Sequence, residues 1–508
     1  MDWNTLQTGM ATASDRPRDS DMPDRAFRLN ALSRLLDGTM YDHLLYDFEE
    51  DYQKGGAGEY VPTRLRRPSI RHDWCRIAVE DSVALLFSEG RFPTIAGDDE
   101  PTRDTIAALV KETALNATMV ECATRGSIGT AVILFRAMGE AAPGLRVFFD
   151  CLDPSTLTPT YKPTEPDVLL SVREGYKIKR ADLLAAGYAE GALLPATETT
   201  FWFAREWTET AETWFLPQTM TDKRDGKPPQ IDAGRTVNHA LGFVPIVWVR
   251  NLPGGQGVDG RPTLTPGAIS TMIEADYQVS QAGRGQRYNG EPTLLVKDDG
   301  SLQNRSHTGG STNAITVPFE GDAKLLEISG NATKAVLDFV QHLRATVLEG
   351  MRGNRTDADK LSAASSGRAM ELMNQSLIWL ADQLRVSYGE GALLSLMRMV
   401  CRANEGRKLL IDGKTIAAGT LKPDGLALRW RPWYSPTYTD AQAQASTLNA
   451  LHNGGLMSRE TAVTQIAAPY DIEDVPAELA AIANDQATDD ARMIALAAQT
   501  KANATVES

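Results

Sequence analysis

Cysteine is scarce in this sequence, and its spacing excludes two common roles. The 508 residues include four cysteines, Cys75, Cys122, Cys151 and Cys401, and none of them belongs to a CxxC pair. Such wide spacing argues against a disulfide framework and against a structural zinc site, and it fits a reducing cytoplasm.

Long apolar runs and an excess of basic charge are also missing. The N-terminus through Met22 and Pro23 is polar, and the run ADLLAAGYAEGALLPA is short and broken by glycines and charges, so we expect neither a signal peptide nor a membrane span. The chain carries 66 acidic and 52 basic residues, so tight binding of phosphates over the whole surface is not expected. The composition therefore predicts a soluble protein without a membrane partner, in which any contact with nucleic acid is local or loose.

Motifs for cofactors and phosphates are incomplete. Gly255 to Gly260 read GQGVDG, a formal GxGxxG, but Arg261-Pro262 follow and no helix opens at the last glycine, so we interpret the segment as a turn. Gly413-Lys414-Thr415 resembles the end of a phosphate-binding loop, but Lys408 stands where that loop needs a glycine. The preferred interpretation is a hairpin turn at Asp412-Gly413.

Metal and charge clusters give no catalytic centre either. The six histidines lack the spacing of a metal site, and we predict a non-enzymatic protein with no cofactor and no metal. Two charged clusters stand out: Asp47, Glu49, Glu50 and Asp51, and then Arg64, Arg66, Arg67 and Arg71. The acidic cluster lacks the oxygen spacing of a calcium loop and predicts a solvated helix end. The basic cluster predicts solvated surface, with contact to DNA or to an acidic neighbouring subunit as the alternative.

Helix and strand signals are both abundant, and they predict an α+β fold that is predominantly helical. Residues 1–24 are polar and predict a flexible lead, and apolar residues then recur at helical spacing from Phe27 to Glu50. Residues 145–250 carry short β-branched and aromatic runs between Pro, Gly and Asp clusters, which indicate antiparallel strands.

The second half of the chain predicts two long helices around a small β insert. One helix of roughly twenty residues begins at Pro266, with Thr265 as its cap. The other spans about 332–352, where Val336, Val340 and Leu343 begin a helical apolar stripe. The insert holds the strand-like runs TLLV, AITV and KLLEI, and the polar segment NRTDADKLSAAS follows the second helix.

Another helix follows this polar segment. We expect it to break at Gly389 and Gly391 before it resumes. Short helices from 438 and a flexible tail from 487 complete the chain.

In this order the parts resemble the portal proteins of tailed bacteriophages, and the resemblance covers most of the sequence. The segments that carry it are RLNALSRLLDGTMYDHLL, LGFVPIVWVRNLP, GAISTMIEADYQVSQAGRGQRY, ATKAVLDFVQHLRATVLEGM, SSGRAMELMNQSL and LRWRPWYSPTYTDAQAQASTLNALHNGG. It implies the following division: flexible lead 1–24, wing 25–264, stem helix 265–289, clip 290–331, stem helix 332–352, tunnel loop 353–366, long helix and wing return 367–437, crown 438–486 and tail 487–508.

The resemblance also implies a function, which the residues alone do not give. A portal subunit packs into a closed homo-oligomeric ring, expected to be a dodecamer, at one vertex of the viral capsid, and double-stranded DNA passes through the ring without sequence specificity. The implied partners are the terminase large subunit, the head–tail connector or adaptor, and the capsid and scaffolding proteins. The implied location is the virion, after assembly in the host bacterial cytoplasm. The rival hypotheses are another structural virion protein or a nucleotide-using enzyme with an unrecognised site.

The same resemblance assigns roles to particular residues. In the tunnel loop, the residues that would face DNA are Asn354, Arg355, Asp357, Asp359 and Lys360. Candidate channel cations, which otherwise form salt bridges between subunits, are Arg284, Arg287, Arg344 and Arg352. The partner-binding residues of the clip are Lys297, Asp298, Asp299 and Arg305. The alternatives are an ordinary exposed helix connection for the loop and a small β subdomain packed on its own chain for the clip.

Overall fold

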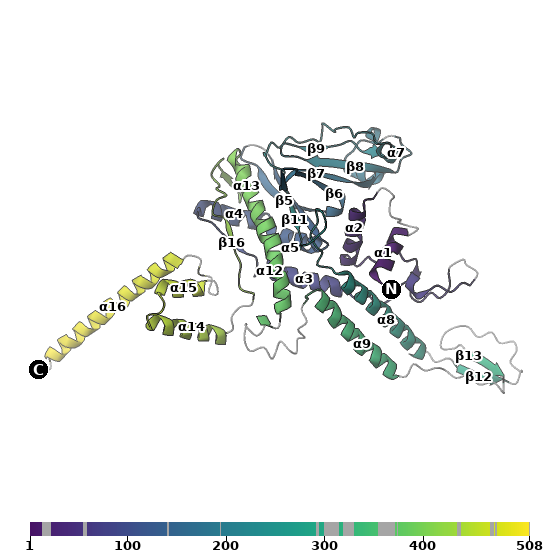
Figure 1. Cartoon of the computed structure of the whole chain (residues 1–508). Helices are drawn as coiled ribbons and strands as arrows, with labels where there is room; N and C mark the ends of the chain where they lie inside the picture. Colours follow the sequence, from purple (N-terminus) through teal and green to yellow (C-terminus); the bar gives the residue numbers. More distant parts are fainter. Residues whose placement is uncertain are drawn as a thin grey trace. The chain divides into compact units, whose positions relative to one another are not determined.

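The chain folds into helices and mainly antiparallel sheets, as a computed structural model shows (Figure 1). About 49% of the residues are helical and 20% lie in strands, which makes the fold α+β, as the sequence predicts. The structure describes residues 1–12, 22–53, 58–139, 142–193, 195–290, 294–298, 314–318, 330–353, 371–372, 374–433, 438–467, 472 and 475–506. Of these, the backbone alone is described at 192, 288–290, 294–298, 314–318, 330–333, 438–440 and 496–506.

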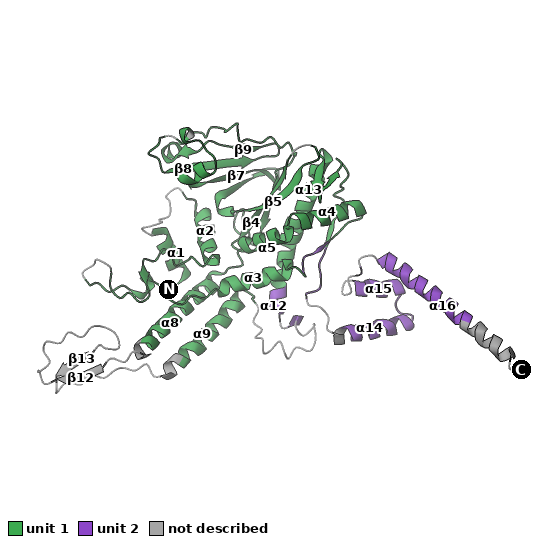
Figure 2. Cartoon of the chain, turned by 180° about the vertical axis from the view of Figure 1, so that it is seen from behind, with its two compact units in different colours: residues 1–90, 95–355, 379–428 green, residues 91–94, 356–378, 429–508 purple. Residues whose placement is uncertain are grey.

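Two compact units divide the chain (Figure 2). Unit 1 comprises residues 1–90, 95–355 and 379–428, and unit 2 comprises residues 91–94, 356–378 and 429–508. The helices up to residue 405 are α1 Trp3–Thr12, α2 Asp24–Leu36, α3 Trp74–Phe87, α4 Glu100–Glu112, α5 Leu115–Gly126, α6 Arg180–Ala185, α7 Met220–Arg224, α8 Pro266–Gly290, α9 Gly330–Gly350, α12 Gln375–Leu384 and α13 Ser395–Glu405. Short 3₁₀ turns are η1 Thr63–Leu65, η2 Pro154–Thr156 and η3 Glu190–Ala192.

The main sheets lie between residues 130 and 250, and the antiparallel pairing expected there is confirmed. One sheet has the order β11-β4-β5, and the other has the order β10-β8-β7-β6 with β9 paired to β8. Their strands are β4 Thr130–Met138, β5 Arg146–Leu152, β6 Leu157–Lys162, β7 Glu165–Lys179, β8 Thr200–Trp207, β9 Glu212–Trp214, β10 Gln218–Thr219 and β11 Ile246–Arg250. The remaining strands form two-stranded pairs: β1 Tyr46–Asp47 with β2 Arg66–Arg67, β3 Thr94–Ala96 with β16 Ala427–Arg429, β12 Leu294–Asp298 with β13 Ala314–Pro318, and β14 Leu409–Ile411 with β15 Lys414–Ile416.

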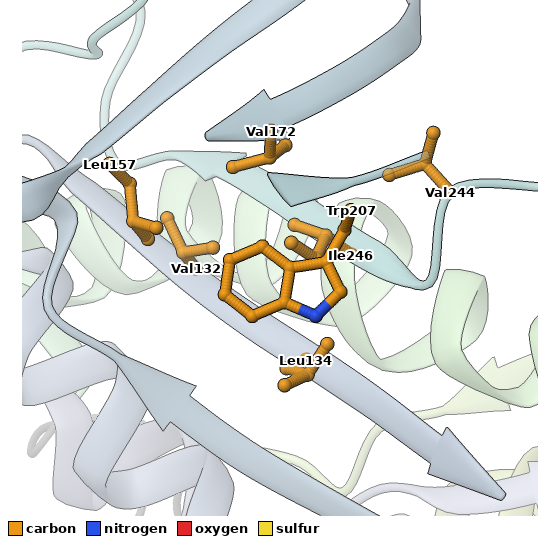
Figure 3. Close-up of a cluster of buried hydrophobic side chains, with 7 residues drawn as sticks. All are labelled: Val132, Leu134, Leu157, Val172, Trp207, Val244 and Ile246. Carbon is orange, nitrogen blue, oxygen red and sulfur yellow. The ribbon is translucent and has the colours of Figure 1, made fainter. Parts of the chain in front are cut away.

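The core of unit 1 joins the two main sheets around Trp207. This fully buried indole from β8 lies among apolar side chains of β4, β6, β7 and β11 (Figure 3). The other members of the cluster are Val132, Leu134, Leu157, Val172, Val244 and Ile246. Alternation along the strands places these side chains on facing surfaces, so burial of apolar area holds the sheets together.

Two predictions about turns are confirmed. Lys414 pairs with Ile411 across the β14–β15 hairpin, so Asp412-Gly413 is its turn, with both residues at positive φ. The segment from Gly255 to Gly260 is a loop of turns, and the next helix begins only at Pro266. Gly260 fits there because a β-carbon would come within 2.5 Å of the Asn251 amide nitrogen.

The prediction of a flexible lead is wrong for its first part. Residues 3–12 form α1, and this helix buries Trp3, Leu6 and Met10. The Trp3 amide donates to Ser270 Oγ of α8 at 3.1 Å. Apolar residues at positions 3, 6 and 10 form a helical stripe, so tertiary packing orders a segment whose composition is polar.

The long helix after the polar segment is not broken at its glycines, which corrects a second prediction. α12 continues through a π-helical segment, η4 Arg385–Leu394, into α13. Within η4, Ser387 Oγ donates to the Asn251 carbonyl at 2.7 Å, and Tyr388 OH donates to Asn251 Oδ1 at 3.0 Å. These contacts stabilise the wider turns, which are rare in proteins and usually last for a single turn.

Unit 2 contains three C-terminal helices, α14 Tyr438–Asn453, α15 Arg459–Ala467 and α16 Val475–Val506. Arg459 at the start of α15 donates to Gln486 Oε1 of α16 at 2.6 Å. The predicted helices are confirmed, and α16 continues through the segment predicted as a tail to Val506. Its alanine-rich sequence favours a helix over its whole length.

Candidate functional site

The antiparallel pair of long helices, α8 and α9, is the element on which the functional hypothesis depends. Both expected helices are confirmed, with α8 at Pro266–Gly290 and α9 at Gly330–Gly350. They lie side by side in Figures 1 and 2, and the end of α9 packs on the start of α8, where Gly350 faces Ala268 and Thr265. α9 ends as the amide of Gly353 donates to the Leu348 carbonyl at 2.8 Å, with Arg352 at a φ of 56°.

A buried carboxylate, Asp276, fixes α8 to the N-terminal segments. Its Oδ2 accepts from Tyr41 OH at 2.7 Å, and its Oδ1 accepts from the His72 amide at 2.9 Å and lies 2.8 Å from His72 Nδ1. Burial raises the pKa of the Asp276 carboxyl, while the His72 and Tyr41 hydrogen bonds oppose that rise. Burial and the neighbouring Asp276 charge raise the pKa of Tyr41 above its usual range, so Tyr41 remains a donor. The cluster therefore holds two chain segments, around Tyr41 and His72, at one point of α8.

Sequence reasoning did not identify Asp276, although a signal was present. The residue lies on the apolar face of α8 with Ile269, Met272 and Ile273, all of them buried. An aspartate at helical spacing within an apolar stripe predicts a buried, hydrogen-bonded carboxylate.

The acidic and basic clusters of the sequence meet in space, which corrects the prediction of a helix end and, for Arg66, the prediction of solvated surface, whereas Arg64 and Arg71 are exposed as predicted. Helix α2 ends at Leu36, so the acidic residues lie on β1 and in the turns after it rather than at a helix end. Asp51 Oδ1 lies 3.0 Å from Arg66 Nη2, and Asp47 Oδ1 lies 2.9 Å from Arg67 Nη2. Arg66 is 1% exposed and also donates to the carbonyls of Val61 and Phe48.

Two of the candidate channel cations belong to this same ionic network. Arg284 of α8 pairs with Asp51 and is 12% exposed, and Arg287 lies 2.6 Å from Glu49 and is 62% exposed. The hydrogen bond from Arg284 lowers the pKa of the Asp51 carboxyl. Both arginines thus have acidic partners within their own chain and anchor α8 to the segment that follows β1.

Of the other site residues predicted from the sequence, some lie on α9 or β12 and the rest lie outside the described residues. Arg344 and Arg352 are exposed on and just after α9. Lys297 and Asp298 are the last two residues of β12, which pairs in parallel with β13. Asn354, Arg355, Asp357, Asp359, Lys360, Asp299 and Arg305 lie outside the described residues.

Asp259, inside the former GxGxxG candidate, is a second buried carboxylate that the sequence did not reveal. Its oxygens accept from Arg25 at 2.8 to 3.1 Å, from Arg28 at 2.9 Å and from Thr130 Oγ1 at 2.9 Å. Arg25 also donates to the carbonyls of Pro154 and Leu157. The loop therefore binds α2 and β4 to the chain that leads into α8. Its carboxylate is neutralised by the two arginines of α2.

A groove of about 830 Å³ borders this loop, with Trp3, Phe27 and Pro262 among its apolar lining residues. Three of its charged groups, Arg25, Arg28 and Asp259, already pair with each other. The groove therefore offers apolar surface rather than a nucleophile beside a base.

Metal-ligating side chains do not gather in the part of the chain that the structure describes, and two of its buried cysteines are unreactive. No group of three or more His, Cys, Asp or Glu side chains there is arranged to hold a metal ion. Burial raises the pKa of Cys75 to about 12 and that of Cys401 to about 11, so these thiols stay protonated near neutral pH. Among the described helices, none has the length and apolar character needed to cross a membrane.

Comparison with known proteins adds no relative: the sequence matches no protein-family model and no curated protein.

Proposed function

We propose that this chain is the subunit of a ring-shaped channel for double-stranded DNA, similar to the portal proteins of tailed bacteriophages. In this role a dodecameric ring stands at one vertex of the capsid, and DNA enters during packaging and leaves during ejection. The subunit has no catalytic centre of its own; the terminase large subunit supplies the motor, and the connector or adaptor binds after packaging.

The observation that carries the proposal is the α8/α9 hairpin together with what interrupts and follows it. A strand pair, β12–β13, lies in the connection between the two helices, and the polar segment after α9 leads to the α12–η4–α13 helix. This order corresponds to stem, clip, stem, tunnel loop and long helix. A capsid or tail-tube subunit does not require two long antiparallel helices with a β insert between them.

Anchoring of α8 supports a mechanical role. Asp276, Arg284 and Arg287 fix this helix to the segments around residues 41–72 through charged and buried hydrogen bonds. A channel wall must keep its position while DNA slides past it, and hydrogen bonds to charged groups are among the stronger noncovalent contacts.

Charge supports the proposal as well. The formal net charge is −14, and the cations Arg66, Arg67, Arg284 and Arg287 are neutralised by acidic neighbours. Each fixed cation on a channel wall adds to the grip on phosphates, since binding releases condensed counterions. A wall with few uncompensated cations lets DNA move.

The strand pair β12–β13 fits the role of a docking element for the terminase and the connector, because strands join partners through main-chain hydrogen bonds. Lys297, Asp298, Asp299 and Arg305 are the side chains proposed to select those partners.

Electron microscopy of the purified protein tests the proposal. We expect closed rings with a central channel in negative stain and a single high-mass species in native mass spectrometry. Monomers at micromolar concentration, or open-ended tubes without a closed ring, would contradict the proposal; tubes would favour a tail-tube subunit instead.

A further inference from the structure

The α12–η4 helix carries a second apolar stripe on the side that faces away from its own core. Leu377, Leu380 and Leu384 are at most 3% exposed and pack inward. On the opposite side, Trp379 is 56% exposed and Val386 is 59% exposed. These two residues are seven apart, which places them on one face two helical turns apart. Two large apolar side chains exposed on one helix face offer an apolar surface for a contact.

Acidic residues flank this stripe. Asp382 lies between Trp379 and Val386 on the exposed face, and Glu390 is exposed one turn further along in η4. Within the described residues neither carboxylate has an ion-pair partner. We refer to Trp379, Asp382, Val386 and Glu390 as the acidic stripe.

Helix α9 carries the opposite pattern. Leu337 is 55% exposed, and Lys334 and Arg344, three residues before it and seven after it, are exposed on the same face. No acidic partner for either cation occurs in the described part of the chain. We refer to Lys334, Leu337 and Arg344 as the basic stripe.

The spacings of the two stripes are similar. Lys334 and Arg344 are ten residues apart, or roughly 15 Å along an α-helix, and Asp382 and Glu390 are eight residues apart, or at most roughly 12 Å because part of that span is π-helical. Each stripe thus presents an apolar side chain between two charges of one sign, and these paired charges are opposite on the two stripes, although the exposed Asp338 lies beside Leu337 on the basic one. Leu337, Trp379 and Val386 each have more than half of their surface exposed, so the described part of the same copy does not cover them.

We infer that the acidic stripe of one copy binds the basic stripe of the next copy of this chain. Because two different surfaces meet, the contact is head-to-tail, and repetition of a head-to-tail contact closes a ring or extends a filament. The inference rests on the proposed ring and adds which surfaces of unit 1 build it. It also assigns Arg344 to the contact between subunits rather than to the channel.

A charge-swap series tests this contact. The variant Lys334→Glu/Arg344→Glu places like charges at the contact, and the variant Asp382→Lys/Glu390→Lys does the same from the other side. We expect each to raise the protein concentration needed for half-maximal assembly about tenfold or more, as measured by native mass spectrometry. The combination of all four substitutions restores opposite charges and should bring assembly back to within about threefold of wild type.

A matched control separates local contact from net charge. Lys111→Glu/Lys179→Glu makes the same charge change at exposed lysines of α4 and β7, and it should leave assembly unchanged. If either double variant assembles as well as the wild type, or if the variant with all four substitutions fails to assemble, the inference is overturned and the ring proposal stands. Wild-type protein that never assembles overturns both.

Cross-linking provides a second measurement that keeps the native charges. A mixture of the Trp379→Cys variant with the Leu337→Cys variant should give cross-linked dimers with a short bis-maleimide, whereas each variant alone should give few. The control is Leu170→Cys on β7, which is 53% exposed and lies in neither stripe. The inference would be overturned if the Trp379→Cys and Leu337→Cys mixture gave no more cross-linked dimer than a mixture that contains Leu170→Cys in place of one of them.

Discussion

At the scale of single residues, loss of the Asp259 carboxylate should lower the stability of the fold. It is 1% exposed and compensates both Arg25 and Arg28, so Asp259→Asn keeps the shape but leaves two guanidinium groups without their counter-charge. We expect the free energy of unfolding to fall by about 3 kcal/mol, the usual cost of breaking a buried ion pair. Chemical denaturation followed by circular dichroism measures this. Asp167→Asn, at an exposed position of β7, is the control and should change little.

Asp259 and Asp276 show which buried carboxylates can be predicted from the sequence and which cannot. The loop around Asp259 was correctly identified as a turn from Arg261-Pro262, but its partners Arg25, Arg28 and Thr130 are more than a hundred residues away, and no local pattern indicates them. Asp276 was detectable because it interrupts an apolar helical stripe.

At the scale of elements, the attachment of α8 should depend on pH through Asp51. The Arg284 hydrogen bond lowers the pKa of the Asp51 carboxyl, so this contact stabilises the fold above the ordinary aspartate pKa and is lost as pH falls through the lowered value. Arg284→Gln should therefore reduce stability by about 1–2 kcal/mol at pH 7 and by progressively less towards pH 3.

Thermal unfolding of both proteins from pH 7 to pH 3 measures this difference. Arg287→Gln is the matched control: its side chain is 62% exposed, and an exposed ion pair contributes at most about 1 kcal/mol. A constant gap between wild type and Arg284→Gln over the whole pH range would contradict the role given to Asp51.

Elements with strong helical periodicity were predictable, and those shaped by distant contacts were not. α8 and α9 follow from apolar spacing and from Thr265-Pro266 at the start of α8. The helix through Gly389 and Gly391 stays continuous because Asn251 binds Ser387 and Tyr388 and because Gly126 leaves room for the Tyr388 hydroxyl, which would lie 2.0 Å from a β-carbon there. These contacts join parts of the chain that no sequence window contains together.

At the scale of the whole molecule, the cations of a chain with a formal net charge of −14 fall into groups with different environments. Arg66, Arg67, Arg284 and Arg287 are used internally, Lys334 and Arg344 are exposed without partners in the described part of the chain, and Arg355 and Lys360 belong to the polar segment after α9. The sequence alone could not tell which of these cations are paired, since pairing depends on the fold. If the ring is correct, Arg355 and Lys360, together with the exposed Arg352, are the candidate cations for contact with DNA.

The double variant Arg355→Ala/Lys360→Ala tests that assignment in the assembled particle. Loss of two transient phosphate contacts should lower the amount of nuclease-protected DNA in an in vitro packaging reaction by on the order of tenfold, and it should flatten the salt dependence because each phosphate contact contributes about one to that slope. Ring assembly should persist, since the proposed contacts between subunits lie on α9 and α12–η4. Lys111→Ala/Lys179→Ala removes the same charge elsewhere and should package normally. Packaging that is unchanged in the Arg355→Ala/Lys360→Ala rings at every salt concentration would show that these two cations do not handle DNA, even in a genuine channel.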